Sequence, residues 1–159
     1  MDRDPHVLQA DHLPTPFTAA EIREHSRPGR IVRSLVARAG EPPAVRVTRS
    51  VAVDGIGWQF EGWMETPDGS RVTEPELGRS AWLDLQRHAS MPAATTSIAE
   101  ETIDIPAGRF ECLRYTRADG ESLDTFWFAR TEPGAPIRFE MRVRGELVLS
   151  SITIEIAQE

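Results

Sequence analysis

Few residues in this sequence could do chemistry, and the cysteine is the first to consider. Cys112 is the only cysteine of the chain and lies in the stretch IPAGRFECLRYT, residues 105–116. A nucleophilic cysteine needs a lowered pKa and an exposed, electropositive surrounding. Cys112 instead lies within an expected strand on the same face as Phe110, and buried free cysteines are common core residues. We therefore expect Cys112 to be structural, with Tyr115 on the opposite face of that strand.

The four histidines show no spacing typical of a metal site. No HExxH or comparable pattern joins His6, His12, His25 and His88, so we expect neither a metal nor a cofactor. His88 follows Asp84 by four residues on an expected helix, and such a pair could orient a general base. No serine in a nucleophile-elbow context accompanies the pair. A surface ion pair is the simpler interpretation, and a hydrolase using Asp84 and His88 is the weakest of our hypotheses.

Paired carboxylates do not point to catalysis either. Glu100 and Glu101 are neighbours in an expected strand and so face opposite sides of it. Glu74 and Glu76 flank Pro75 in an expected loop. Neither arrangement resembles the facing carboxylates of a glycosidase. We therefore expect no catalytic residue and interpret the protein as not being an enzyme.

Composition excludes several other functions. The chain has 159 residues with 25 acidic side chains against 18 basic ones, and its formal net charge of −7 disfavours binding to a phosphate backbone. All the basic residues are arginine. Without lysine, the protein can use neither Schiff-base catalysis nor the lysine of a P-loop.

The sequence also gives an expectation about the location of the protein. The N-terminus has no basic and apolar signal-peptide regions, and no apolar run reaches the roughly 18 residues of a membrane span. We therefore expect a cytoplasmic protein without a membrane-spanning helix.

Two short helices and one long series of strands are expected to position these residues. Residues 1–16 carry three prolines and are expected to form an extended N-terminal arm, followed by a single domain over 17–159. Thr18 and Glu21 form a capping-box pattern that predicts a helix start, and that helix ends at RPGR. A second helix is expected within 80–89, with Ser80 as its N-cap.

The rest of the chain reads as strands separated by turns. The strand segments are 30–38, 44–53, 57–66, 71–74, 97–105, 109–117, 122–130, 136–144 and 146–156. Their short connections predict antiparallel neighbours, because a parallel crossover needs a dozen or more residues. The expected fold is α+β: a strongly curved, half-barrel-like meander of about eight strands with two short helices.

Two of the strands carry large apolar side chains on both faces. In the segment 57–66, Trp58 and Phe60 share one face and Trp63 takes the other. In the segment 122–130, Trp127 falls on the face opposite to Phe126. Both faces therefore need cover, which could come from a sheet that closes on its own core, from a lipophilic ligand, or from a second subunit.

The second half of the chain resembles a bacterial domain of unknown function. Members of that family carry an "aGtf…C…y" hairpin, then an aromatic "yWfa" strand and an "lPv" turn and strand. The matching residues, within about 103–143, are Ala107–Phe110 with Cys112, Phe126–Ala129, and Gly134–Ile137. The family is similar to the curved half-barrels of lipoprotein-localisation factors, which hold acyl chains against a concave sheet. The resemblance implies this fold and brings no catalytic residue.

Three functions follow as hypotheses. The first is a non-catalytic module that binds a hydrophobic small molecule or an acyl chain in the concavity of the sheet. Its expected apolar lining is Trp58, Phe60, Trp82, Trp127 and Phe139. The second is a protein-interaction or homodimerisation domain that buries the same aromatic face, and the third is the Asp84–His88 hydrolase.

Overall fold

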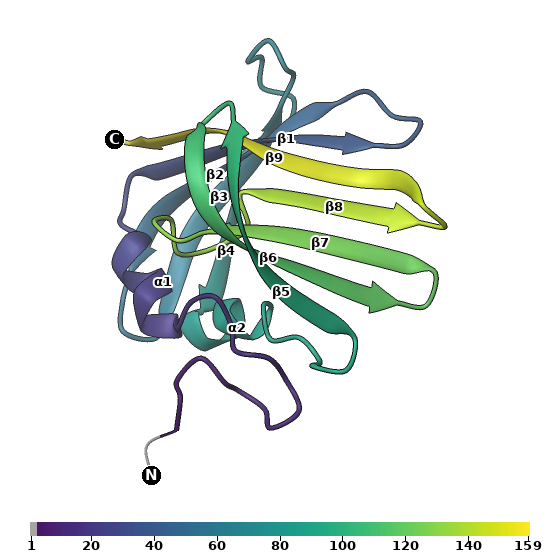
Figure 1. The fold of residues 1–159 in the computed structure, drawn as a ribbon. Helices are drawn as coiled ribbons and strands as arrows, with labels where there is room; N and C mark the ends of the chain where they lie inside the picture. Colours follow the sequence, from purple (N-terminus) through teal and green to yellow (C-terminus); the bar gives the residue numbers. More distant parts are fainter. Residues whose placement is uncertain (1–2) are drawn as a thin grey trace.

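The computed structural model describes residues 3–159 as one antiparallel sheet with two short helices (Figure 1). The helices are α1 (Ala19–His25) and α2 (Trp82–Arg87). The strands are β1 (Arg30–Arg38), β2 (Ala44–Val53), β3 (Gly57–Glu65), β4 (Glu76–Ala81), β5 (Thr96–Ile105), β6 (Gly108–Asp119), β7 (Ser122–Ala129), β8 (Arg138–Val143) and β9 (Glu146–Gln158). The predicted curved antiparallel meander with two short helices is confirmed, with nine strands in place of about eight.

The strand order is β4-β3-β2-β1-β9-β8-β7-β6-β5. The strands therefore form two hairpin-connected halves, β1–β4 and β5–β9, which meet where β1 pairs with β9. This leaves β4 and β5 as the two edges of the sheet, and the chain passes from one edge to the other through α2.

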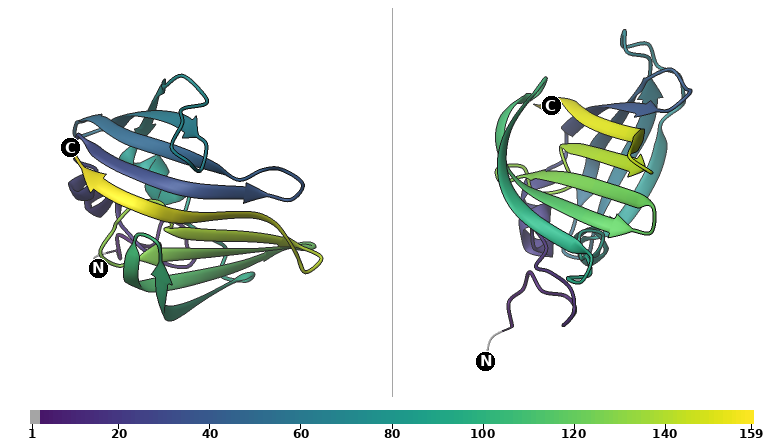
Figure 2. Two further views of the ribbon diagram at one scale, coloured as in Figure 1. Left: turned by 90° about the horizontal axis from the view of Figure 1, so that it is seen from above. Right: turned by 45° about the vertical axis from the view of Figure 1, so that its right-hand side comes forward.

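The strong curvature follows from the contacts of the helices. One hydrophobic cluster contains Phe17, Ile22 and Trp82 from the helical side, Tyr115 from β6 and Phe128 from β7, and Trp58 of β3 packs against it. In a flat sheet, the five inter-strand steps between β3 and β7 would cover about 24 Å. The helices contact both halves because the sheet curves around them (Figure 2). We call this helix-facing, concave side the inner face and the opposite side the outer face.

The start of α1 follows the predicted capping box. The Thr18 hydroxyl accepts a hydrogen bond from the backbone N–H of Glu21, and the Glu21 carboxylate accepts one from the backbone N–H of Thr18. These two bonds satisfy N–H groups that the helix itself leaves free, so the helix begins at this point in the chain.

The prediction for residues 71–81 was wrong in two respects. Residues 71–74 form no strand beyond one bridge between Arg71 and Glu65, and the strand in this region is β4. Ser80 lies within β4, and α2 has Ala81 at its N-cap with no side-chain hydrogen bond. Residues 76–81 form a strand although their own strand propensity is low, because pairing with the free edge of β3 satisfies their backbone N–H and C=O groups.

The segment before α1 lies against the helical end of the half-barrel. The Tyr115 hydroxyl donates to the Pro14 carbonyl oxygen at 2.6 Å, and the Leu13 N–H donates to the Met91 carbonyl oxygen at 2.9 Å. The Gln86 side chain donates to the Pro5 carbonyl oxygen at 2.9 Å and to the Thr15 hydroxyl at 3.0 Å. These bonds connect the segment to the same cluster that joins the two halves of the sheet.

Candidate functional site

The inner face brings together four of the five predicted lining residues. Trp58 and Phe60 of β3 and Phe139 of β8 point to this face, and Trp82 of α2 packs within the helical cluster above it. Trp127 does not join them. Its side chain lies on the outer face, as its alternation with Phe126 predicts, so it cannot contribute to an inner lining.

Trp127 contacts both charged and apolar side chains on the outer face. Its indole N–H donates to a Glu101 carboxylate oxygen at 2.7 Å, and the Arg138 guanidinium lies 4.6 Å from the ring centroid. The ring belongs to an outer-face cluster that also contains Cys112, Ile103 and Ile137. The hairpin of β5 and β6 thus provides the cover that the apolar outer side of β7 needs.

The four inner residues differ in how fully they are covered. Trp82 is 4% exposed, and its indole N–H donates to the Asp54 carbonyl oxygen at 2.7 Å. Trp58 stacks on Phe60 with ring centroids 4.4 Å apart, and the Trp58 indole donates to the Ser50 hydroxyl at 2.8 Å. Phe60 and Phe139 are only half-buried and lie outside the helical cluster. The helices therefore cover one part of the inner face and leave another part accessible.

The accessible part of the inner face combines apolar side chains with small ones, and it also carries Arg46 of β2 and the Arg117–Asp124 ion pair of β6 and β7. Its half-buried apolar residues, as the strand register places them, are Phe60 and Met64 on β3, Phe139, Met141 and Val143 on β8, and Leu149 on β9. The central pair β1 and β9 turns four small or β-branched side chains to the same face; Ser34 and Ser151 are half-buried, whereas Val36 and Thr153 are buried. Sequence reasoning missed these small side chains because serine and threonine in a strand carry no signal of their own.

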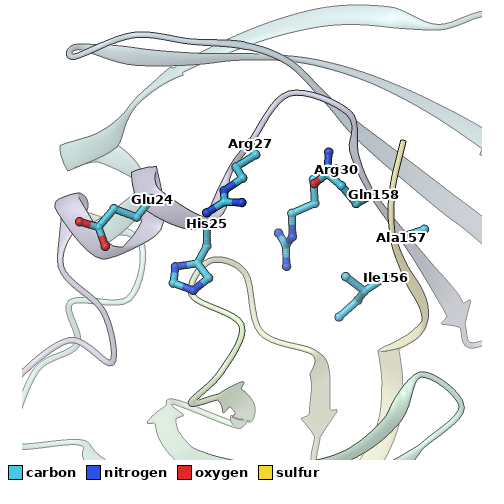
Figure 3. A pocket seen from close by; sticks show the side chains of 7 residues that line it. All are labelled: Glu24, His25, Arg27, Arg30, Ile156, Ala157 and Gln158. Carbon is cyan, nitrogen blue, oxygen red and sulfur yellow. The ribbon is translucent and has the colours of Figure 1, made fainter.

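Within residues 3–159, two of the hollows lie against the sheet, and neither is an enclosed apolar cavity. The first, of about 390 Å³, lies between the end of α1 and the paired ends of β1 and β9 (Figure 3). The second, of about 400 Å³, is lined by Glu100, Glu101, Thr102, Glu111, Cys112 and Arg130 on β5, β6 and the end of β7. Both include charged side chains in their lining.

The groups considered for catalysis take up structural positions. Cys112 is 1% exposed, and burial raises the pKa of its thiol to about 11, which leaves it protonated at neutral pH. Its placement confirms the prediction of a buried core cysteine, and Tyr115 points to the opposite face as expected. The Asp84 carboxylate pairs with Arg87 at 2.7 Å instead of with His88. The predicted Asp84–His88 pair is therefore wrong, because a charged neighbour one turn away on the same helix satisfies the carboxylate.

Two carboxylates of the outer face show shifted pKa values for reasons that are structural. The hydrogen bond from Trp127, followed by the bond and charge of Arg114, lowers the pKa of Glu101. Hydrogen bonds from Trp63 and Arg33 lower the pKa of Glu65 against an opposing effect of burial. Both groups are acceptors within ladders of cross-strand contacts. Over residues 3–159, no group of three or more His, Cys, Asp or Glu side chains is placed to hold a metal ion.

Comparison with known proteins supports the fold and leaves the function open. No protein-family model matches the chain, and no curated protein matches its sequence. Among solved structures, the crystal structure of MucB is similar, with a TM-score of 0.58 and 11% sequence identity. The match covers 87% of this chain and 56% of the MucB chain, so this protein spans little more than half of MucB. At this identity the likeness supports the fold alone, and because no family model matches, the bacterial domain that residues 103–143 resemble stays a prediction.

The part of the chain that the structure describes contains no helix that is long and apolar enough to cross a membrane.

Proposed function

We propose that this protein is a non-catalytic binding module that holds a hydrophobic small molecule or an acyl chain against its inner face. One observation carries the proposal: the helices cover Trp82 and its neighbours, while apolar side chains of β3, β8 and β9 on the same concave face are left half-buried. Apolar surface that faces inward without cover favours an apolar occupant, because each Å² removed from water contributes about 25 cal/mol. The likeness to MucB supports the half-barrel frame for such binding.

The proposal is tested by native mass spectrometry of the purified protein, followed by denaturation and extraction into organic solvent. A bound mass of a few hundred daltons that extracts with lipids supports the proposal. A protein that carries nothing and also fails to bind any long-chain probe argues against it.

A matched pair of substitutions locates the binding. Phe139→Ala removes an aromatic ring from the inner face, where the centroids of the Phe139 and Phe126 rings lie 4.9 Å apart. We expect this substitution to weaken the binding of a fluorescent fatty acid several-fold. Leu123→Ala is the control, since Leu123 lies on the outer face of the neighbouring strand and is 42% exposed. Equal effects of the two substitutions would contradict an inner binding site.

A second candidate function is protein interaction at the β4 edge, and a separate observation favours it. β4 is an edge strand whose Leu77 is 79% exposed, and Ile56, in the turn before the neighbouring strand β3, is 78% exposed. Exposed edges that carry large apolar residues are typical of sites where another chain adds a strand. If a partner binds here, Leu77→Glu abolishes a concentration-dependent increase in mass measured by analytical ultracentrifugation. A protein that stays monomeric at all concentrations removes self-association from consideration.

A further inference from the structure

Of the two hollows described above, the one at the end of α1 is the more basic. Its lining residues are Glu24, His25, Arg27, Arg30, Ile156, Ala157 and Gln158. They come from the last turn of α1, the connection to β1, the first residue of β1 and the end of β9. Two arginines and a histidine thus surround about 390 Å³ of space in a protein whose net charge is −7.

The directions of the side chains make this set of charges available to a ligand. Figure 3 shows Arg27, Arg30 and His25 extending into the space between α1 and β9, while the Glu24 carboxylate points away from both guanidinium groups. Within residues 3–159, Arg27 makes no ion pair. Arg30 has one nitrogen bonded to Glu132 at 2.8 Å, which fixes the side chain and leaves other N–H groups to donate. The Nδ1 atom of His25 lies 3.2 Å from the Glu21 carbonyl oxygen, which fixes the ring.

The hollow adjoins one end of the inner face. Arg30 pairs with Gln158, and the next inner-facing pairs along the two strands are Val32 with Ile156, Ser34 with Thr153, and Val36 with Ser151. From Arg30 to Val36 these strands run for about 20 Å. The basic end and the apolar face are therefore joined along one pair of strands, with Ile156 belonging to both.

From this juxtaposition we infer that the protein binds an anionic single-chain amphiphile. The carboxylate or phosphate head group lies in the hollow between Arg27, Arg30 and His25, and the chain lies along β1 and β9 on the inner face. Arginine suits this role, because its planar guanidinium donates paired hydrogen bonds to carboxylate and phosphate oxygens. The inference rests on the proposed function, which it deepens by naming the class of ligand and the position of its polar end.

The test compares oleate and methyl oleate, which have the same acyl chain but a charged and an uncharged head group. The affinity of the protein for each is measured by isothermal titration calorimetry. The inference predicts that oleate binds at least ten-fold more tightly. Arg27→Gln removes the guanidinium that has no ion pair and is expected to reduce that preference to about three-fold or less without changing the affinity for methyl oleate. Arg23→Gln is the matched control, since Arg23 is an exposed arginine of α1, four residues before Arg27, and does not line the hollow.

The outcomes separate the inference from the proposal on which it rests. Equal binding of both ligands, or an oleate preference that Arg27→Gln and Arg23→Gln reduce alike, overturns the head-group site and leaves the binding of apolar chains in place. Failure of both ligands to bind overturns the head-group inference and the proposed function together. Inorganic phosphate is the third probe: if it raises the melting temperature in an Arg27-dependent manner and neither oleate nor methyl oleate binds, the hollow is a site for a free anion and the amphiphile inference is wrong.

Discussion

At the scale of single residues, the outer face shows how polar contacts are built into an apolar sheet. Glu101 accepts from the Trp127 indole at 2.7 Å and from Arg114 at 3.0 Å, so a carboxylate and a guanidinium lie next to a buried ring. The indole N–H would otherwise lack a partner in a cluster where Trp127 is only 7% exposed. The sequence placed Trp127 on the face opposite to Phe126 but carried no sign of this pairing, because Glu101 lies on another strand.

The lowered pKa of Glu101 gives a prediction about stability and pH. A carboxyl group whose folded-state pKa is depressed stabilises the fold above its unfolded pKa of about 4.3, and this contribution is lost as the pH falls through the folded value. We expect Glu101→Gln to be less stable than the unmodified protein at pH 7 and the difference to shrink between pH 5 and pH 3. Urea unfolding at a series of pH values measures it, and a difference that grows on acidification would contradict the assignment.

Cys112 provides a second prediction at this scale. A thiol that is 1% exposed and has a pKa raised to about 11 should be almost inert. We expect an aromatic disulfide reagent at pH 8 to modify the native protein at least a hundred-fold more slowly than the protein in denaturant. Rapid modification of the native protein would show that the β5–β6 hairpin opens readily.

At the scale of elements, the edge strand β4 depends on a glycine. A Cβ at Gly78 would overlap the Cζ and Cε2 atoms of Phe60, so the aromatic ring occupies the place of a side chain. We expect Gly78→Ala to destabilise the fold by about 1–3 kcal/mol through overpacking. The double variant with Phe60→Ala should recover part of this loss, as a double-mutant cycle in urea would reveal.

Gly62→Ala is the control for this cycle. Gly62 is on β3, the partner of β4, and its nearest neighbour would be the Val47 carbonyl oxygen at 3.6 Å, an ordinary contact. A cost for Gly62→Ala as large as that for Gly78→Ala would mean that strand propensity, and not the Phe60 ring, explains the result.

The elements also show how far the sequence could predict the fold. The β-branched residues of 30–38 and 44–53 and the capping box at Thr18 are local signals, and β1, β2 and α1 form where these signals indicate. β4 was not predicted, because this strand forms by pairing with the free edge of β3 and not from a local pattern in its own residues. The placement of the five aromatic residues was predicted only in part, because alternation gives the face of each residue on its own strand but not which faces of different strands coincide. The basic hollow forms where two distant segments, 24–30 and 156–158, meet, and no local pattern in the sequence indicates that meeting.

At the scale of the whole molecule, the helical cluster joins the two halves of the sheet. Trp82 is 4% exposed in that cluster, and the same cluster holds side chains from β6 and β7 while Trp58 of β3 packs on it. We expect Trp82→Ala to cost about 3–5 kcal/mol and to increase the binding of a hydrophobic dye, because the halves lose their common contact. Leu83→Ala, at the exposed neighbouring position, should change the free energy of unfolding by less than about 1 kcal/mol.

The central claim is that an apolar ligand lies on the inner face of the half-barrel, and photo-crosslinking tests it most directly. A fatty acid that carries a diazirine at the end of its chain is bound, irradiated, and mapped by peptide mass spectrometry. The account predicts adducts on inner-facing side chains of β3, β8 and β9, with Phe60, Phe139, Met141 and Leu149 as the expected positions. Adducts confined to the outer face, at Leu123 or around the Trp127 cluster, would contradict it.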